Sequence, residues 1–401
     1  MPLSPTKIAV VEAAAIPFGL GSWSAMESKA ASPVPAFAEQ RNRFPAAYRV
    51  LEEAMEARAF PGCAFGVLEG GEIVLLDALG RFTYEENAPA VSAETVYDVA
   101  SLTKVVATTA VAMRLVEQGQ MDLDTPLGEV LPGFILGRDA AERARRVTLR
   151  HLLAHSSGLP GYAELFRTCS TAAALMRACL ALPLEAAPGA RAEYSDPGFI
   201  LLGKAIEVLT HERFAELARR EVFEALEMRP TGFRPAAAAR ALIPPTEEDR
   251  TFRHRRIQGE VQDENAFVLD GVSGHAGLFS NVPDLLRLSA AILNSASGAD
   301  GGTGSAGLFQ AGTVEQFAER QGPEGSSRAI GWDTPGENSS AGRHFSRHSI
   351  GHLGYSGCSL WIDLDAGVAA VLLTNRTWPD RASQLIRAVR PAFHDAVREA
   401  L

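Results

Sequence analysis

The chain has little of what several protein classes require. Four cysteines are scattered through 401 residues without C-x-x-C spacing, so neither a disulfide framework nor a zinc site is required. No uninterrupted apolar stretch reaches transmembrane length. No G-x-S-x-G segment occurs, which argues against an α/β-hydrolase.

Positive charge is outweighed by negative charge. The chain carries 38 Lys and Arg against 48 Asp and Glu, a formal net charge of −10. This balance argues against nucleic acid or an anionic membrane surface as a partner. The basic run at residues 250–256 lies beside three acidic residues and is typical of a solvated loop. With 46% hydrophobic residues, the chain can bury a large core, as one domain or two lobes.

The first 43 residues are rich in Ala, Ser and Pro, and we expect a leader or loose arm there. Residues 8–20 are apolar apart from Glu12 and Pro17, which makes a poor signal peptide. A cytoplasmic location is therefore slightly favoured, with a periplasmic or secreted one if residues 1–30 act as a signal.

The patterning beyond this arm predicts an α/β (α+β) domain over residues 44–401 with a sheet lobe and a helical lobe. Helices are expected at residues 45–58, 149–154, 172–182, 199–210, 213–226 and 382–401, and strands at 63–68, 72–79, 355–364 and 368–374. Both chain ends would build one sheet lobe, from about 44–110 and 310–401, with the helical lobe, about 111–309, inserted between them. Residues 295–307 are a low-complexity loop.

A serine and a lysine stand three residues apart at the start of an apolar run. Gly and Pro are absent from Ser101 to Gly119, which predicts a buried helix with Ser101 in its first turn. Residues three apart share a helix face, so the Lys104 amine can reach the Ser101 hydroxyl. A serine needs such a base to become a nucleophile, and a lysine can serve if its pKa is lowered.

The run "YDVASLTKVVATTAVAMRLVEQGQMDLDTPLGEVLPGF" resembles the active-site segment of the serine β-lactamase and penicillin-binding protein superfamily, on its class C and esterase side. The resemblance implies a β-lactamase-like fold, an antiparallel sheet flanked by terminal helices with an inserted helical lobe. It also implies a serine hydrolase without a cofactor or metal.

The segment "EYSDPG" is similar to the second motif of that family, Y-x-N. The resemblance implies that Tyr194 faces Ser101 and relays protons. Asp196 stands where the family has asparagine and would contact the substrate, as in several esterase-like members. An alternative alignment takes Ser195 as the start of an S-D-N triplet, but the residues around it match the class C pattern better.

The segment "GHLGYSGCSLW" resembles the third motif, K-T-G, with His352 in place of lysine. The resemblance implies that the Tyr355 backbone N–H joins that of Ser101 in an oxyanion hole. His352 would act as a cleft cation or donor, and Gly354 would let substrate approach the backbone. Leu353 replaces a hydroxyl residue, which weakens recognition of a substrate carboxylate.

Further family-like segments are "TLRHLLAHSSGLPGY", "GEVQDENAFVLDGVSGHAGLFSNVPDL" and "AIGWDTP". Trp332 in the last is expected to line the pocket. His155, Ser156 and His275 are open between structural and cleft-lining roles.

The expected function is hydrolysis of an ester or amide through an acyl-enzyme, with a small molecule or short peptide such as a β-lactam or D-Ala-D-Ala peptide as substrate. The alternative is a penicillin-binding-like module with little turnover. A zinc site at His344, His348 and His352 would need a helix there, against the glycines that follow. Oligomeric state is left open.

Overall fold

The structure is a computed structural model that describes residues 37–136, 141–298 and 307–401. Most of the expected arm and the middle of the low-complexity loop lie outside these residues. Residues 37–43, expected in the arm, instead form helix α1 (Phe37–Arg43). The helix docks on the sheet because Gln40 accepts a hydrogen bond of 2.7 Å from the backbone of Leu76.

A five-stranded antiparallel sheet joins the two ends of the described chain. Its order is β2-β1-β10-β9-β8. The strands are β1 (Gly62–Glu69), β2 (Glu72–Gly80), β8 (Ser349–Leu353), β9 (Ser359–Asp363) and β10 (Val368–Thr374). Strand β10 pairs with β1 in the register Cys63 to Thr374. The prediction that both ends of the folded chain build one antiparallel sheet is confirmed.

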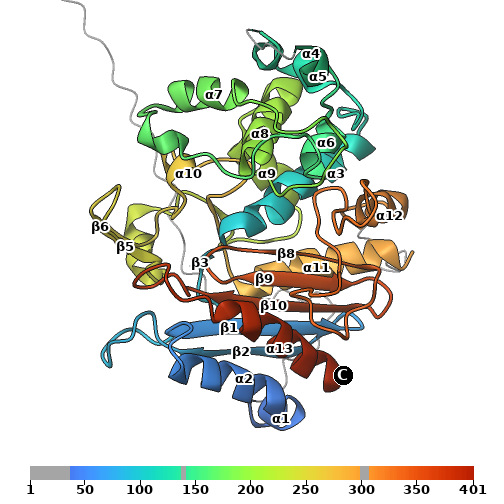
Figure 1. The fold of residues 1–401 in the computed structure, drawn as a ribbon. Helices are drawn as coiled ribbons and strands as arrows, with labels where there is room; N and C mark the ends of the chain where they lie inside the picture. The colour runs from blue at the N-terminus through green and yellow to red at the C-terminus, as the bar shows by residue number, and fades with distance from the viewer. Residues whose placement is uncertain (1–36, 137–140, 299–306) are drawn as a thin grey trace, which may run out of the picture. The chain divides into compact units, whose positions relative to one another are not determined.

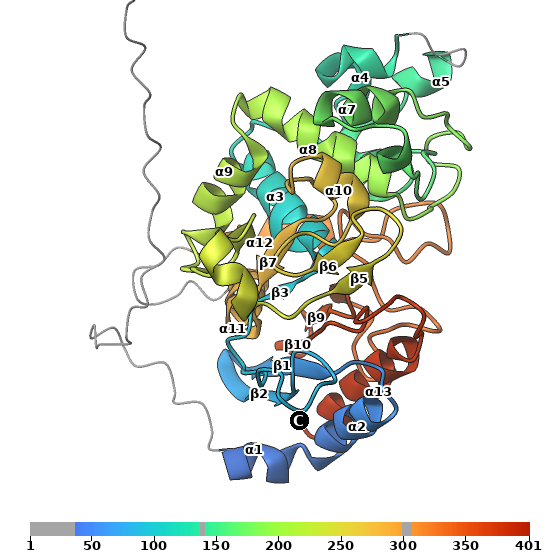
Figure 2. The same ribbon diagram turned by 90° about the vertical axis from the view of Figure 1, so that its left-hand side faces the viewer.

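Helices cover both faces of this sheet. Phe65 and Val67 of β1 pack with α2 (Pro45–Glu56) and α13 (Ile386–Glu399). Their neighbour Gly66 faces the other way, where an added Cβ would lie 2.6 Å from Val282 of α11. This alternation is the period of two expected of a strand, and burial on both faces explains why β1 and β10 are apolar throughout. Figures 1 and 2 show α2 and α13 together on one face and α11 on the other.

Most of the remaining elements form the helical part above β8 in Figure 1, whereas α11 lies against the sheet. The helices are α3 (Ala110–Glu117), α4 (Leu127–Val130), α5 (Ala141–Arg145), α6 (Leu149–Leu153), α7 (Ala172–Leu180), α8 (Asp196–Thr210), α9 (Phe214–Ala218), α10 (Glu264–Val268), α11 (Val282–Ala296) and α12 (Ala311–Ala318). Short strands are β3 (Tyr97–Asp98), β4 (Gly232–Phe233), β5 (Glu247–Asp249), β6 (Arg255–Ile257) and β7 (Leu278–Ser280). No helix of the described ranges is long and apolar enough to cross a membrane.

Several predicted boundaries are wrong. The helix expected from Ser101 is a 3-10 turn, a π-helical segment (Lys104–Thr109) and then α3. The one expected at 213–226 is α9 followed by a second π-helical segment. α11 was placed in the helical lobe, but its apolar side packs on β1 and β10.

The strand expected from residue 355 begins at Ser359, because the preceding residues turn between β8 and β9. Gly357 makes this turn with a φ of 108°, and its N–H bonds back to Gly354. Glycine adopts this conformation without the clash that a Cβ would cause.

Arg390 of α13 holds this turn from below. Its side chain is 6% exposed and donates hydrogen bonds to the carbonyl oxygens of Gly354, Gly357 and Cys358, at 2.5, 3.2 and 2.8 Å. Burial lowers its pKa to about 10, so the guanidinium keeps its charge at neutral pH.

Replacing Arg390 by methionine keeps the length of the side chain and removes all three donors. We expect a loss of about 3 kcal/mol in the free energy of unfolding, because buried carbonyl groups lose their partners. Urea denaturation measures it. The control Arg167→Met removes an exposed ion pair with Glu164; an equal loss in both variants would contradict the assignment.

Candidate active site

Ser101 lies directly after a short strand. Strand β3 ends at Asp98, Ala100 has a φ of 48°, and a 3-10 turn (Ala100–Leu102) carries Ser101. Residues three apart eclipse one another in this kind of helix. Lys104 follows at the start of the π-helical segment, and its Nζ donates a hydrogen bond of 3.0 Å to Ser101 Oγ.

Lys104 is fully buried, and its amine is surrounded by acceptors. Besides Ser101 Oγ, the Nζ donates to Asp196 Oδ1 at 2.7 Å and to the carbonyl oxygen of His275 at 3.1 Å. An ammonium has three N–H groups, so each has a partner here. The environment therefore favours the charged form.

The pKa of Lys104 is consequently raised, not lowered. Burial is the largest single effect and acts to lower it, but the electrostatic effects of Asp196 and Tyr194 and the hydrogen bonds to both residues together outweigh burial. The condition stated from the sequence, that a lysine can serve as the base if its pKa is lowered, is not met in the resting site, because a carboxylate lies against the amine. At neutral pH, Lys104 and Asp196 form a buried ion pair, with Asp196 15% exposed.

Tyr194 approaches Ser101 from the opposite side. Its hydroxyl lies 2.8 Å from Ser101 Oγ, and its ring centroid lies 4.8 Å from Lys104 Nζ. Burial and the nearby Asp196 carboxylate raise the pKa of Tyr194 to about 12, so it is a neutral phenol at rest. The three groups expected to meet, Ser101, Lys104 and Tyr194, do so.

His155 holds the backbone on both sides of Tyr194. The N–H of Glu193 donates to the His155 carbonyl at 2.8 Å, and the N–H of Ser195 donates to its Nδ1 at 3.0 Å. The imidazole stacks against the Tyr194 ring, with centroids 4.7 Å apart. Burial and the charge of Arg328 hold the pKa of His155 well below 6.5, so the ring is neutral. Of the two open roles, the structure favours support of Tyr194.

The start of α8 explains the position of Asp196. Ser195 caps this helix, since its Oγ accepts the N–H of Gly198 at 3.1 Å. The same Oγ donates to the carbonyl of Pro160, so it is occupied away from Ser101 and the S-D-N reading fails. Asp196 follows in the first turn, where its side chain meets Lys104.

Two glycines allow α8 to pack closely against the segment around residue 274, whose His275 carbonyl accepts a hydrogen bond from Lys104. An added Cβ on Gly274 would lie 2.3 Å from the carbonyl oxygen of Phe199, and one on Gly203 would lie 2.9 Å from the Gly274 nitrogen. No other residue fits at this distance. The neighbouring His275 can thus present its carbonyl to Lys104.

The His275 side chain fastens this segment to a second loop. Its ring nitrogens contact Ser273 Oγ at 2.8 Å and Asp263 Oδ1 at 2.9 Å. Although burial opposes ionisation, His275 helps to lower the pKa of Asp263 to about 2. His275 therefore has a structural role, and Asp263 adds a second carboxylate near Lys104. Asp263 is not among the residues predicted from the sequence.

Ser156, the other residue whose role the sequence left open, is also buried. Its backbone carbonyl accepts the N–H of Gly189.

The third wall comes from β8. His352 is 3% exposed, and its Nδ1 lies 2.8 Å from the carbonyl of Leu353. Burial and the charge of Lys104 hold the pKa of His352 well below 6.5, so the ring is neutral. Of the two roles expected from the sequence, cleft cation or hydrogen-bond donor, the structure contradicts the cation. Trp332 is 1% exposed. The bridge between Asp333 and Gly351 sets it opposite His352, so it supports the wall and contributes almost no surface to the pocket.

Gly354 and Tyr355 end this wall. An added Cβ on Gly354 would lie 2.4 Å from the carbonyl oxygen of Val99, so this glycine accommodates the nucleophile segment rather than substrate. Tyr355 has a half-exposed ring under the guanidinium of Arg376, 4.4 Å from its centroid. Its backbone N–H has no hydrogen-bond acceptor among the described residues. This N–H is therefore available to a ligand.

Arg328 is a cation that the sequence analysis missed. Its guanidinium carbon lies 5.5 Å from the Tyr194 ring centroid, and its charge depresses the pKa of both His155 and His352. It pairs loosely with Asp333, at 3.6 Å, and is 22% exposed. It lies two residues before the "IGW" run, and no local pattern marks it.

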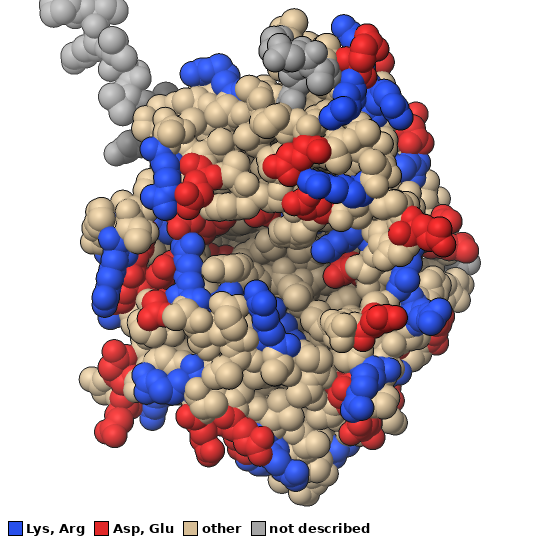
Figure 3. Space-filling model, viewed as in Figure 1, with Lys and Arg blue, Asp and Glu red and all other residues tan. Residues whose placement is uncertain are grey.

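In the view of Figure 1, Figure 3 shows a hollow in the surface, with carboxylates visible inside it and Lys and Arg side chains around the rim.

Zinc ligation by the three histidines is not supported. His344 pairs with Glu399 and His348 with Asp365, both exposed, whereas His352 is buried on β8. Over the ranges that the structure covers, no His, Cys, Asp and Glu side chains cluster as a metal site.

Comparisons with known proteins show what the chain is similar to. A protein of Bacillus subtilis named N-acetylmuramyl-L-alanine amidase is 31% identical over 357 residues, which cover 80% of this chain and 78% of that protein. The solved structure of EstCE1, a hydrolase with promiscuous acyltransferase activity, superposes with a TM-score of 0.70 at 21% identity and covers 90% of this chain and all of its own.

The octameric penicillin-binding protein homologue from Pyrococcus abyssi superposes with a TM-score of 0.65 at 22% identity, over 86% of this chain and 76% of its own. At such identities, the likeness to the two solved structures shows the fold alone. The family model described as Beta-lactamase matches residues 48–392. The chain therefore belongs to the Beta-lactamase family of serine hydrolases.

Proposed function

We propose that this protein hydrolyses an ester or amide through an acyl-enzyme on Ser101. The observation that carries the proposal is the meeting of Ser101 Oγ with Lys104 Nζ at 3.0 Å and with the Tyr194 hydroxyl at 2.8 Å. A serine hydroxyl flanked by a base and a second proton carrier is the arrangement that nucleophilic catalysis needs.

In the proposed reaction, the neutral form of Lys104 takes the Ser101 proton as Oγ attacks the substrate carbonyl. The backbone N–H groups of Ser101 and Tyr355 stabilise the oxyanion. Tyr194 passes a proton to the leaving alcohol or amine, and Lys104 restores it. Water then attacks the acyl-enzyme with Tyr194 as proton carrier, which releases the acid and returns the Ser101 proton.

Two observations bear on the substrate. Asp196 replaces an amide side chain, which suits an ester better than a peptide that needs an amide partner. Arg328 supplies a guanidinium beside His352, where the lysine of the third motif is missing. We propose that Arg328 recognises a carboxylate on the substrate, as carried by D-Ala-D-Ala peptides and β-lactams.

Replacing Ser101 by alanine should abolish hydrolysis of p-nitrophenyl esters and covalent labelling by a fluorophosphonate, because it removes the hydroxyl that is hydrogen-bonded to both Lys104 and Tyr194. Time courses of both measurements test this. A wild-type rate in the variant would exclude Ser101 as the nucleophile. Labelling of the wild type without turnover would favour the binding module over the enzyme.

The ion pair predicts an alkaline pH dependence. Since Asp196 raises the pKa of Lys104, kcat/KM should increase with pH as the ammonium loses its proton. Asp196→Asn removes the charge that stabilises the ammonium, so this rise should move about 1 to 3 pH units lower. Stopped-flow ester hydrolysis across the pH range measures it.

The control for this shift is Glu193→Gln, which removes the same charge from an exposed ion pair with Arg191. We expect its pH profile to match that of the wild type. A lower rate in Asp196→Asn at every pH, without a shift, would mean that Asp196 has a different role.

Replacing Arg328 by alanine should increase KM about tenfold for substrates with a carboxylate, since a charged hydrogen bond contributes about 1.5 kcal/mol or more. KM for neutral acetyl and butyryl esters should change little. A panel of short esters, nitrocefin and a D-Ala-D-Ala peptide tests this, with Arg328→Lys as the variant that retains the charge. Equal changes for charged and neutral substrates would exclude carboxylate recognition.

A further inference from the structure

Asp98 ends β3 three residues before Ser101, and its polar atoms contact three separate segments. It is 2% exposed. Oδ1 accepts the N–H of Ala100 at 2.9 Å, Oδ2 accepts the N–H of Gln262 at 2.7 Å, and the carbonyl oxygen accepts the Ser356 hydroxyl at 2.7 Å. A carboxylate can accept both N–H groups at once, which no neutral side chain of the same shape can do.

The first contact acts on the backbone that presents Ser101. Ala100 has a φ of 48°, a conformation that costs a non-glycine residue on the order of 1 kcal/mol or more unless its surroundings hold it. The bond to Asp98 Oδ1 is such a restraint. Thr103 adds a second one, because its Oγ1 donates to the Ala100 carbonyl at 2.6 Å. Together they orient the Ser101 N–H.

The third contact acts on the opposite wall. Ser356 follows Tyr355, so its bond to Asp98 ties the turn after β8 to the nucleophile segment. Gly354 lies against Val99, as described above, and closes the gap between the two backbones. The N–H groups of Ser101 and Tyr355 thus belong to two segments that Asp98 and its neighbour Val99 hold together.

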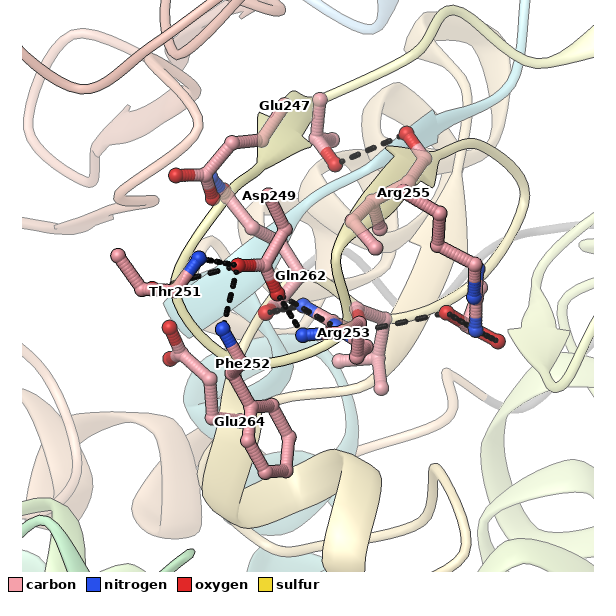
Figure 4. A network of polar contacts seen from close by, with 12 residues as sticks. Glu247, Asp249, Thr251, Phe252, Arg253, Arg255, Gln262 and Glu264 are labelled. Carbon is pink, nitrogen blue, oxygen red and sulfur yellow. Dashed lines mark hydrogen bonds and ion pairs between the residues drawn. The ribbon is translucent and has the colours of Figure 1, made fainter. Parts of the chain in front are cut away.

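The second contact leads to a polar network around the hairpin of β5 and β6, shown in Figure 4. The Gln262 carbonyl accepts a hydrogen bond of 2.5 Å from the guanidinium of Arg253. The Arg253 side chain is 4% exposed and pairs with Asp249 at 3.2 Å. Asp249 in turn accepts the backbone N–H groups of Thr251, Phe252 and Arg253. Gln262 is therefore a rigid donor for Asp98.

We propose that Asp98 is a positioning residue whose carboxylate orients the Ser101 N–H group relative to the Tyr355 N–H group in the oxyanion hole. The inference rests on the proposed function, since the oxyanion hole has a role here only if the acyl-enzyme reaction takes place. The hydrogen bonds of Asp98 do not depend on that function. Oxyanion stabilisation depends on donors placed before the reaction, so loss of the restraint should slow the chemical step more than it weakens substrate binding.

The charge of Asp98 gives this role a pH signature. Burial raises its pKa to about 6, against the opposing effect of the Gln262 and Ala100 N–H groups. Other groups face it: Asp263 raises the pKa further, Arg253 lowers it, and the Cys358 thiol lies 3.9 Å from the Asp98 carbonyl. Below pH 6, protonation removes one acceptor, so kcat should fall on the acid side.

Protonation of Asp98 changes stability in the opposite direction to kcat. A raised carboxyl pKa means that folding favours the protonated form, so the Asp98 contribution to stability decreases as pH rises through about 6. At neutral pH, Asp98→Asn loses one hydrogen bond but also removes a buried charge. A small change in Tm with a large change in kcat is therefore expected, which a merely structural residue would not produce.

The experiment compares Asp98→Asn with Asp284→Asn. Asp284 lies in α11, is 3% exposed, has a pKa raised to about 6 by burial and bonds to Thr231 at 2.6 Å. It matches Asp98 in burial and charge but has no contact with the site. We expect Asp98→Asn to lower kcat roughly 10²-fold with KM changed less than about threefold, and to lose the acid limb near pH 6. Asp284→Asn should keep both.

Hydrogen exchange supplies a readout that needs no activity. Peptides covering residues 98–104 and 260–264, which hold the two N–H groups that bond to the Asp98 carboxylate, should exchange at least about tenfold faster in Asp98→Asn and unchanged in Asp284→Asn. Unchanged exchange in both peptides, or an acid limb that survives in Asp98→Asn, would overturn the proposal. If the wild type neither labels with fluorophosphonate nor turns over, the proposed function fails, and exchange alone still decides whether the Asp98 carboxylate holds the segment that carries Ser101.

Discussion

The structure depends on the cost of burying one ammonium group. Lys104 is 0% exposed, and a charge in such a place is tolerated only when it is paired and hydrogen-bonded. Asp196, Ser101 and the carbonyl of His275 meet this need from three different parts of the chain. The start of α8, the 3-10 turn and the glycine contact between α8 and residue 274 all follow from bringing these acceptors to one point.

The site concentrates its charge in few groups. Lys104, Asp196 and Arg328 are charged, whereas Tyr194, His155 and His352 are neutral because burial disfavours their ionised forms. The two histidines therefore act through shape and hydrogen bonds. Asp196 stands where the family pattern has an amide, so one substitution changes the resting proton distribution of the whole site.

The local parts of this site were predictable from the sequence. Ser101 and Lys104 are three residues apart, and Tyr194 lies in a short motif, so spacing and resemblance found all three. The fold class, the terminal helices and the hairpin of β1 and β2 followed from periodicity. The charge state of His352 was not predictable, because it depends on burial and on Lys104 and Arg328.

Arg328 and Asp263 were missed for a related reason. Each lies in or beside a family-like segment, but only tertiary contacts show that its side chain reaches the site. The misplaced start of β9 has a different cause, because the apolar run beginning at Tyr355 includes a turn that only the positive φ of Gly357 reveals. Trp332 belongs to a family-like segment, but the sequence carries no information on whether its ring faces the pocket or the core.

The register of the central sheet has a consequence for biosynthesis. Cys63 of β1 pairs with Thr374 of β10. During synthesis, β1 therefore cannot pair with β10 until nearly the whole polypeptide has left the ribosome. Until then, one edge of an apolar hairpin is unpaired, which is the kind of edge that other chains can join. Early in synthesis, the hairpin of β1 and β2 is thus the segment with most to gain from a chaperone, and truncation before β10 would leave a strand prone to aggregation.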